Sequence, residues 1–383
     1  MNSLENIIYF DNNATTPIDK RVLDAMLPFL TTNFANPSST HHFGITANEA
    51  VKKARTQVAD LIGSDKNEII FTSGSTEAIN IALKGIAENY SAKGKHIITV
   101  STEHYAVLDT CKHLGSRGYE VTYLPVSKDG LIDLQELKNS LRGDTILVCV
   151  MYVNNETGVI QPIKEIASLA HEAGALFMTD ATQAAGKIEI DVDTLGIDLM
   201  SMSGHKMYAP KGVGALYVRQ CMNRVKIPAY IHGGGHEQGV RSGTLNVAGI
   251  VALAEACEIA QQEMKQDAER ISALRNELEN ELLKIEGTFV NGKTESKIFN
   301  TTNICFRGND ANVLIGRMKN VAVSNGSACT SAVVEPSHVL TAMGLNGDDA
   351  FASIRFSLGR MNTLQEVKEV QTIISRTIIP TLI

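Results

Sequence analysis

Short apolar segments recur along the first two thirds of the chain and predict the strands of a sheet. They are rich in β-branched residues, and several of them, such as residues 145–153 (TILVCVMYV), are apolar without alternation. Runs of this kind are typical of strands that are buried on both faces of a sheet. The seven predicted strands are Glu68–Thr72, His96–Val100, Glu120–Leu124, Thr145–Val153, Leu176–Thr179, Asp198–Met202 and Gly214–Val218.

Helical patterns lie between these strands. Apolar residues recur there at steps of three and four, which is the spacing of one face of an α-helix. The clearest segments are residues 47–62, 76–90, 106–117 and 163–173. Alternating strands and helices predict an α/β fold with a parallel or mostly parallel sheet between two layers of helices.

The pattern changes after about residue 246, where one helical stretch of about forty residues begins. A strand at 302–306, a helix at 311–318, a strand at 353–357 and a helix from Leu364 follow it. This α+β order predicts a second, smaller domain. We expect the large domain to span residues 15–260, and the small domain to combine residues 1–14 with residues 261–383.

Composition and charge narrow the classes of partner. The 35 Lys and Arg residues against 42 Asp and Glu residues give a net charge of −7, without a long basic run. We therefore expect neither a nucleic acid nor a membrane as a main partner. The first residues, MNSLENIIYF, have no basic region followed by an apolar one, so we expect no signal peptide and a cytoplasmic protein.

The six cysteines do not form a metal or redox motif. No two of them are closer than 24 residues, which excludes C-x-x-C spacing and indicates a reducing compartment. The run HGGGHEQG at 232–239 carries two histidines, but its three glycines favour a flexible turn over a zinc-binding helix. No intrinsic metal site is predicted.

The segment FTSGSTEAIN at 71–80 is a candidate phosphate site. A predicted strand ends there and a helix begins, with Ser75 and Thr76 at the start of the helix. Free backbone N–H groups and the positive end of the helix dipole favour a phosphate at such a place. Ser and Thr are also the usual N-caps of helices, so a purely structural cap is the alternative.

Further polar residues follow the other predicted strands. His104, Asp180 and Lys206 each come just after a buried strand, at the edge of a parallel sheet where ligands bind. A helix start for a phosphate, an acid for a pyridinium nitrogen, an imidazole to stack and a lysine to form an imine are what pyridoxal phosphate requires. Each residue alone has an ordinary structural explanation, but the set in this order predicts a pyridoxal-phosphate site.

Motifs along nearly the whole chain resemble one family. The sequence is similar to cysteine desulfurases of the NifS/IscS type, in the class V aminotransferase family of pyridoxal-phosphate enzymes. The resemblance implies an aspartate-aminotransferase-like fold, with a seven-stranded mostly parallel sheet in the large domain and a smaller α+β domain. It rests on YFDNNATTP (9–17), NPSSTHHFG (36–44), TSGSTEAIN (72–80), TEHYAVL (102–108), VNNETGVIQP (153–162), DATQAAGK (180–187), SGHKMYAPKGVGALYVR (203–219), GGGHEQGVRSGTLN (233–246), SNGSACTS (324–331), EPSHVL (335–340) and IRFSLGR (354–360).

The resemblance assigns roles to individual residues. It implies that Lys206 holds the cofactor covalently and moves the substrate Cα proton, that His104 stacks on the ring and takes part in proton transfer, and that Asp180 keeps the ring nitrogen protonated. It implies substrate binding by Arg355, which grips the carboxylate, and by Asn155. The other cofactor-binding residues that it implies are Ser75, Thr76, Gln183, Ser203, His205 and Thr244, with Asn155 again among them.

Thr244 resembles the residue that reaches the phosphate of a neighbouring subunit, so the resemblance implies a homodimer. Cys329 lies among small polar residues, which favours an exposed loop. By resemblance its thiolate takes the sulfur of L-cysteine, leaving L-alanine and a persulfide. That persulfide would pass to acceptors for iron–sulfur cluster assembly and other sulfur-containing products, and Cys329 could also share a cluster with a scaffold protein.

Two other interpretations stay open. One is a selenocysteine lyase or another pyridoxal-phosphate lyase on the same scaffold, and the other is a non-catalytic sulfur-transfer or adaptor protein. The presence of Lys206 argues against the second. The chain ends at IIPTLI, where relatives of the IscS kind extend further, so the sequence leaves open whether the acceptor is a scaffold protein or another acceptor. It also leaves open whether the protein serves general sulfur supply or nitrogenase alone.

Overall fold

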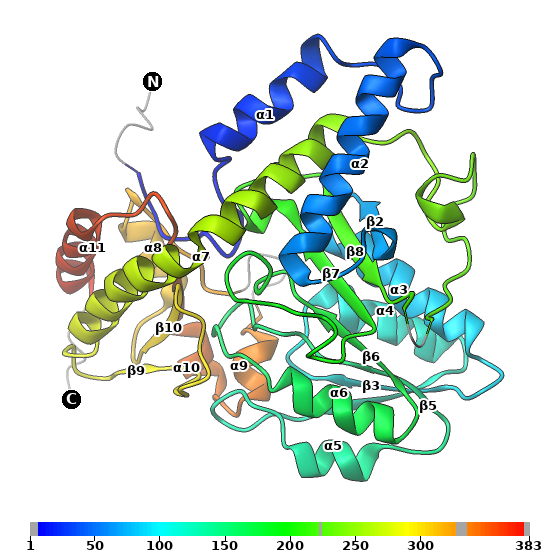
Figure 1. The fold of residues 1–383 in the computed structure, drawn as a ribbon. Helices are drawn as coiled ribbons and strands as arrows, with labels where there is room; N and C mark the ends of the chain where they lie inside the picture. The colour runs from blue at the N-terminus through cyan, green and yellow to red at the C-terminus, as the bar shows by residue number, and fades with distance from the viewer. Residues whose placement is uncertain (1–6, 222–223, 327–334, 379–383) are drawn as a thin grey trace.

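A seven-stranded sheet forms the centre of the larger part of the protein (Figure 1). The computed structural model describes residues 7–221, 224–326 and 335–378. Strand β8 is antiparallel to both of its neighbours, and the other adjacent strands are parallel. In spatial order the strands are β2 (Ile69–Thr72), β8 (Gly214–Val218), β7 (Leu199–Ser203), β6 (Leu176–Asp180), β5 (Thr145–Cys149), β3 (His96–Val100) and β4 (Glu120–Leu124).

The predicted mostly parallel sheet is thus confirmed, and one strand is shorter than predicted. The apolar run at 145–153 continues beyond β5, which ends at Cys149. Val150 and Val153 are still buried after the strand has ended. The Val150 amide still donates to the Met178 carbonyl, and Val153 forms an isolated bridge with Ile160. Burial and pairing thus continue past the strand, so the apolar run alone could not mark its end.

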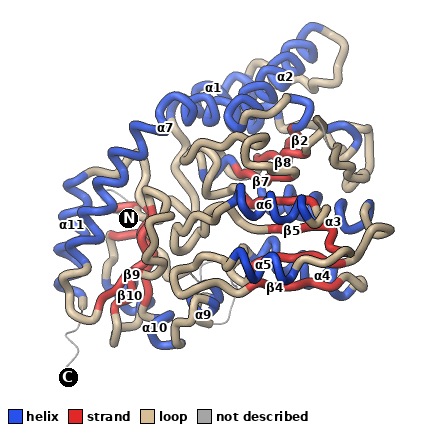
Figure 2. The backbone as a smooth tube through the Cα atoms, turned by 60° about the horizontal axis from the view of Figure 1, so that its bottom comes forward, coloured by secondary structure: helices blue, strands red, loops and turns tan. Residues whose placement is uncertain are grey.

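Helices cover both faces of this sheet (Figure 2). Side chains of successive strand residues point to opposite faces, so Ile70 and Ile97 pack with helices α3 and α4, whereas Phe71 and Ile98 pack on the other face. The helices α3 (Ser75–Asn89) and α4 (Tyr105–Ser116) form one layer, and α2 (His42–Ile62), α5 (Leu134–Ser140), α6 (Ile163–Glu172) and the first half of α7 supply the other.

The long helix α7 (Val247–Leu282) runs from the large sheet to the C-terminal third of the chain (Figure 1). It confirms the predicted long helix, with 36 residues. Helix α1 (Lys20–Thr31), which the sequence analysis did not identify, lies along its first half. Helix α11 (Leu364–Thr377) lies along its second half.

A second group of elements surrounds a small antiparallel sheet of order β12-β10-β9. The first strand of the chain, β1 (Ile8–Tyr9), also lies here and pairs in parallel with β11 (Val321–Ala322). The N-terminal segment therefore belongs spatially with the C-terminal third. The remaining elements are β9 (Thr288–Val290), β10 (Thr301–Phe306), β12 (Ser353–Ser357), α8 (Ala311–Arg317), α9 (His338–Ala342), α10 (Gly347–Phe351), and the 3-10 helices η1 (Lys66–Glu68), η2 (Gly204–Lys206) and η3 (Glu237–Gly239).

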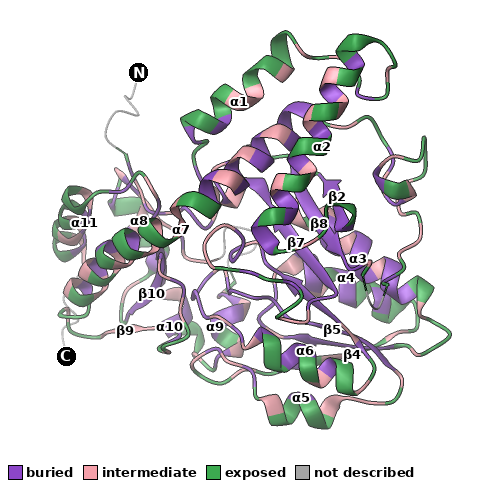
Figure 3. Cartoon of the chain, viewed as in Figure 1, coloured by how far each residue is buried: buried purple, intermediate pink, exposed green. Residues whose placement is uncertain are grey.

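Six strands of the large sheet are almost fully buried, the edge strand β4 is partly exposed, and many exposed residues lie on the outer faces of the helices (Figure 3). A separate apolar cluster lies around the small sheet, with members such as Phe10, Leu278, Phe306 and Phe356. None of the helices in the described ranges is long and apolar enough to cross a membrane.

A close backbone approach brings the start of α3 against the large sheet. A Cβ added to Gly214, at the beginning of β8, would lie 2.5 Å from the carbonyl oxygen of Met202 and 2.7 Å from Cα of Gly74. Gly74 itself has φ of 149°, which non-glycine residues rarely adopt. The two glycines therefore let the N-terminus of α3 approach the carboxyl edge of the sheet.

We predict that Gly214→Ala lowers the free energy of unfolding by about 3 kcal/mol, because the added methyl group overlaps backbone atoms that cannot move away. Urea denaturation followed by circular dichroism measures the change. Gly316→Ala is the control. Gly316 is exposed in α8 with nothing near its Cβ position, so alanine should stabilise the protein by about 0.5 kcal/mol. Equal stability of Gly214→Ala and the unaltered protein would contradict the prediction.

Candidate active site

Six of the residues predicted for the site gather at the carboxyl edge of the large sheet. Asp180 ends β6, Ser203 ends β7, and His205 and Lys206 follow in η2. His104 is the N-cap of α4, a few residues after β3. The sixth, Gln183, comes three residues after β6. The parallel arrangement of these strands explains why residues that are distant in the sequence meet at one edge.

The start of α3 has the character expected of an anion site. Its N-cap is Gly74, and no side chain caps the helix. The Ser75 hydroxyl lies 2.5 Å from the hydroxyl of Thr182, and Thr76 is exposed. The structural alternative, in which a Ser or Thr side chain caps this helix, is therefore wrong. Backbone N–H groups of the first turn remain for an anionic ligand.

Asp180 is buried and oriented by three hydrogen bonds to a single oxygen. Its Oδ1 accepts from the Thr182 amide (3.0 Å), from the Thr182 hydroxyl and from the Ser201 hydroxyl (2.9 Å). No described residue donates to Oδ2. A carboxylate oxygen that no described residue uses, on a carboxylate held in place through its other oxygen, is what a protonated ring nitrogen needs.

Lys206 is held by the N-terminal segment of the chain. Its Nζ donates to the main-chain carbonyls of Asn13 (2.5 Å) and Ala14 (2.7 Å). The Asn13 carbonyl also accepts from Gln183 Nε2 at 2.9 Å. Asn13 thus orients two predicted site residues. Sequence analysis did not assign it a role, although it lies in the motif YFDNNATTP.

Gln183 connects this network to a second lysine. The Nζ of Lys187 donates to Gln183 Oε1 at 2.7 Å. Burial, together with the positive charges of Lys206 and Arg355, lowers the pKa of Lys187 to about 7. Lys187 therefore exchanges its proton near neutral pH. The sequence analysis included it only as the last residue of DATQAAGK.

The two histidines of the site differ in their surroundings. The Nδ1 of His104 accepts a hydrogen bond from the Ala106 amide at 3.1 Å, so the ring in its neutral form carries its proton on Nε2. The Nδ1 of His205 lies 3.2 Å from the Thr15 hydroxyl. Burial and the charge of Lys206 lower the pKa of His205 to about 4, so this ring is neutral at pH 7.

A buried carboxyl group lies behind His104. Glu103 accepts a hydrogen bond from the Met151 amide through Oε1, and its Oε2 is buried without a partner among the described residues. Burial and the nearby charge of Asp180 hold the pKa of Glu103 well above its ordinary value. Burial thus favours the neutral form of Glu103, which avoids a second negative charge next to Asp180.

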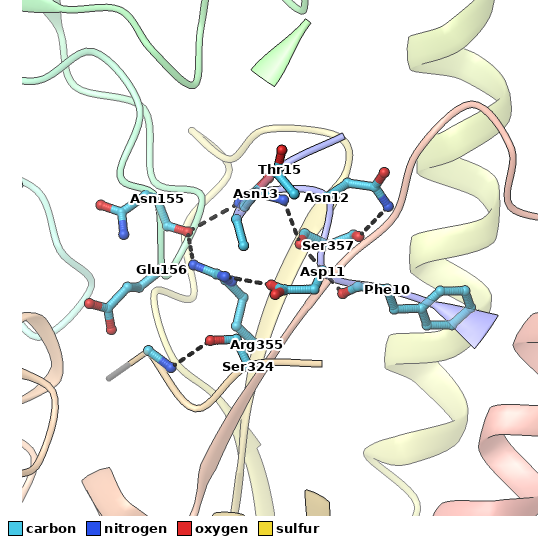
Figure 4. Close-up of polar contacts among 12 residues, drawn as sticks. Phe10, Asp11, Asn12, Asn13, Thr15, Asn155, Glu156, Ser324, Arg355 and Ser357 are labelled. Carbon is cyan, nitrogen blue, oxygen red and sulfur yellow. Dashed lines mark hydrogen bonds and ion pairs between the residues drawn. The ribbon is translucent and has the colours of Figure 1, made fainter. Parts of the chain in front are cut away.

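Arg355 and Asn155 meet at the other side of the site (Figure 4). The guanidinium of Arg355 donates to the main-chain carbonyl of Asn155 at 3.0 Å and to Asp11 Oδ1 at 2.6 Å. Arg355 is buried, and its Nε has no partner among the described residues. The amide of Asn155 points away from this pair. A buried guanidinium with an unused donor is suited to a carboxylate ligand.

The N-terminal segment joins this arginine to the lysine. Asn13 Nδ2 donates to the Asn155 carbonyl (3.1 Å) and to the Thr301 hydroxyl (2.9 Å). Asp11, which pairs with Arg355, lies two residues earlier. Asp11 was not among the predicted site residues, and its place in the motif at 9–17 is the signal in the sequence that points to it.

One described residue among those predicted, Thr244, is not brought into this arrangement. Thr244 is exposed, and it makes no hydrogen bond among the described residues. Cys329 lies in 327–334, outside the described residues. In the ranges that are described, no group of three or more His, Cys, Asp or Glu residues could hold a metal ion.

The residues at this edge fit pyridoxal phosphate. The uncapped start of α3 is suited to the phosphate, and Ser203 lies beside it, 3.5 Å from the Cβ position of Gly74. The free oxygen of Asp180 is suited to the ring nitrogen, and Lys206 is suited to the aldehyde.

Comparisons with known proteins agree with this arrangement. Residues 8–370 match the family model described as aminotransferase class-V. Proteins named cysteine desulfurase IscS are 53% identical in Histophilus somni (strain 129Pt), over 364 residues that cover 94% of this chain and 90% of the relative, and 54% identical in Haemophilus influenzae (strain PittGG), over 363 residues with the same coverage.

Solved structures are similar over nearly the full chain. A NifS-like protein superposes with a TM-score of 0.91 at 39% identity, covering 97% of this chain and 98% of its own. A structure described as SspA in complex with cysteine gives a TM-score of 0.82 at 39% identity, covering 93% of this chain and 99% of its own.

We predict that His205 makes the cofactor-free protein less stable in acid. The pKa of His205 is about 4 in the folded protein and 6.5 in an unfolded chain. Between these values the unfolded chain binds more protons, so the free energy of unfolding falls as the pH is lowered through this window. His205→Gln should lose less stability than the unaltered protein between about pH 6.5 and about pH 4.

Urea denaturation at several pH values measures the effect on His205→Gln. The control is His113→Gln, since His113 is exposed in α4, and this variant should follow the unaltered protein. A His205→Gln protein whose stability depends on pH as steeply as that of the control would contradict the prediction.

Proposed function

This chain belongs to the class-V aminotransferase family, and from this we infer that it is a cysteine desulfurase that depends on pyridoxal phosphate. The observation that carries the inference is the identity of 53–54%, over 94% of the chain, to proteins named cysteine desulfurase IscS. The residues at the carboxyl edge of the large sheet support it, because they meet the chemical requirements of that cofactor.

The cofactor would be held by residues of the large sheet and its helices. Pyridoxal phosphate, when bound, supplies an electron sink for the bonds that change at the substrate Cα. Lys206 would hold it covalently, Asp180 would pair with the ring nitrogen, and His104 would stack on the ring. The remaining contacts would come from Ser75, Thr76, Asn155, Gln183, Ser203 and His205.

The substrate is L-cysteine, and its carboxylate would bind Arg355 and Asn155. Arg355 is buried and keeps one unused donor, which favours a carboxylate over a neutral group. The relative described as SspA in complex with cysteine supports this substrate. The amine of Lys206, held by the carbonyls of Asn13 and Ala14 before substrate binds, would move the proton at the substrate Cα.

Sulfur transfer requires a nucleophile, and we assign that role to Cys329. Its thiolate would form a bond to the substrate sulfur while the bond from that sulfur to the substrate Cβ breaks. The products are L-alanine and a persulfide on Cys329. The persulfide would pass to acceptors for iron–sulfur cluster assembly, through a scaffold protein or another acceptor.

An apolar surface supports a homodimer. Side chains from α1 to the start of α2 are exposed although they are large and apolar, with Phe34 75% exposed and Phe43 63% exposed. Leu23, Leu27 and Leu30 belong to the same surface. Apolar patches of this kind mark interaction sites, and a second copy of the chain would cover this one. Thr244 would then complete the phosphate site of the partner subunit.

We also propose the division into a large domain of residues 15–260 and a small domain of residues 1–14 and 261–383. The apolar cluster around the small sheet supports it, because that cluster combines Ile8 and Phe10 with residues from 271 onward. The five described cysteines are unpaired, which agrees with the reducing, cytoplasmic compartment that a persulfide mechanism needs.

We predict that Cys329→Ala binds pyridoxal phosphate and L-cysteine but releases no sulfide above background in the presence of a reductant, because alanine offers no thiolate. Sulfide release and the absorbance of the bound cofactor measure the two properties. Cys221→Ala is the matched control, since Cys221 is exposed, and it should release sulfide at the rate of the unaltered protein. Undiminished turnover by Cys329→Ala would exclude the persulfide mechanism.

We predict that the unaltered protein is a dimer and that Phe34→Asp shifts it toward monomer, because a charge on the apolar surface must be desolvated in the interface. Light scattering during size-exclusion chromatography measures the mass. Met361→Asp changes a comparable exposed side chain, 57% exposed, outside this surface, and should remain dimeric. A monomeric unaltered protein, or an unaffected Phe34→Asp variant, would overturn this proposal.

A further inference from the structure

Glu156 is a buried carboxyl group next to the substrate residues that has no assigned role. It directly follows Asn155, and its main chain is fixed on both sides. Its amide donates to Asn154 Oδ1 at 3.0 Å, and its carbonyl accepts from Asn303 Nδ2 at 3.2 Å. Glu156 is only 2% exposed, so its carboxyl group needs partners within the protein.

The first partner of this carboxyl group is Ser337, which precedes α9. The Ser337 hydroxyl donates to Glu156 Oε2 at 2.5 Å. The same hydroxyl oxygen accepts the amide of Leu340 at 3.2 Å and caps α9. A hydroxyl can donate only one hydrogen bond. Ser337 donates it to Glu156, while its oxygen accepts the Leu340 amide at the start of α9.

The second partner is Gly326, which approaches from another part of the chain. A Cβ at this position would overlap the Oε2 atom of Glu156, and φ of Gly326 is +83°. The backbone of Gly326 therefore packs directly on the carboxyl group, as only glycine allows. Ser324, two residues before Gly326, forms two main-chain hydrogen bonds with Arg355. The Arg355 amide donates to the Ser324 carbonyl at 2.7 Å, and the Ser324 amide donates to the Arg355 carbonyl at 3.3 Å.

These two partners bracket Cys329 in the sequence. Gly326 comes three residues before Cys329, and Ser337 comes eight residues after it. One carboxyl group thus contacts both described ends of the segment that contains the proposed nucleophile. Glu156 is also the direct neighbour of Asn155 in the sequence, and the Asn155 carbonyl accepts a hydrogen bond from Arg355.

The charges around Glu156 come from two elements. Burial raises the pKa of the carboxyl group to about 7, and this outweighs the hydrogen bond from Ser337 and the charges of Arg355 on β12 and His104 at the start of α4, which lower it. Ser337, Gly326 and Asn303 are uncharged. The carboxyl group therefore changes its protonation state near neutral pH, and both states can accept the hydrogen bond from Ser337.

We propose that Glu156 is a positioning residue for sulfur transfer: it fixes Gly326 and Ser337 relative to the Asn155–Arg355 pair, so that Cys329 is presented to the sulfur of the bound substrate. This inference rests on the proposed function. Binding of L-cysteine and the proton transfer by Lys206 do not require Glu156, whereas formation of the persulfide does.

Rapid mixing with L-cysteine separates these steps. In Glu156→Ala, the change in absorbance of the bound cofactor should keep its rate within about twofold, while L-alanine formation in a single turnover should slow by about 10- to 100-fold, since small misplacements of a reacting group have effects of this size. Glu156→Gln keeps an acceptor for Ser337 and should restore most of the lost rate. Equal slowing of both steps, or rates like those of the unaltered protein, would overturn the proposal.

A second variant covers the case in which Glu156→Ala does not fold. Ser337→Ala removes the hydroxyl from the opposite side and should slow L-alanine formation selectively, by about tenfold. Because it also removes a helix cap, Thr363→Ala is the matched control: Thr363 caps α11, and its loss should cost similar stability, about 1 kcal/mol, without slowing that step. Equal slowing in both variants would contradict the proposal.

Hydrogen exchange on the cofactor-free protein gives a readout apart from activity. Amides near Gly326 and at 338–342 should exchange faster in Glu156→Ala and Ser337→Ala than in Glu156→Gln and Thr363→Ala, and unchanged exchange would contradict the proposed anchoring. Failure of the proposed function is distinguishable, because in that case the unaltered protein would itself release no L-alanine from L-cysteine.

Discussion

The main-chain carbonyl of Asn13 holds the two halves of the site together. It accepts hydrogen bonds from Lys206 and Gln183, both at the edge of the large sheet, while the side chain of the same residue donates to Thr301 and to the carbonyl of Asn155. Every partner is buried or partly buried, so loss of one bond would leave a polar group unsatisfied. The N-terminal segment therefore sets the distance between Lys206, which we propose holds the cofactor, and Arg355, which we propose binds the substrate.

Burial controls the charge of the groups around this centre. It lowers the pKa of Lys187 to about 7 and that of His205 to about 4, and it raises the pKa of Glu103. Each of these groups is shifted toward its neutral form, since a low-polarity environment disfavours charge. Among the charges that remain, Asp180 is suited to the ring nitrogen of the cofactor, and Arg355, paired with Asp11, is suited to a carboxylate.

Much of the fold could be predicted from the sequence, because the elements around the large sheet bury one or both faces. Strands such as β3 and β8 begin and end at the predicted residues. Helix α1 was missed because its large apolar residues, such as Leu27, are exposed in the single chain, so its pattern does not report a buried face. Strand β1 was missed because two residues carry no periodicity, and it forms only by pairing with β11, more than three hundred residues away.

The sequence by itself determined the chemistry available to this protein: a lysine, an acid, an imidazole and a helix start that follow successive strands, and a cysteine among small residues. These groups could be expected to meet because residues that follow parallel strands lie at the same edge of the sheet. Only the tertiary structure decided how those groups are oriented and charged. Asn13 and Glu156 act through contacts with residues far along the chain, and the pKa values, including that of Lys187, follow from burial, which no local pattern records.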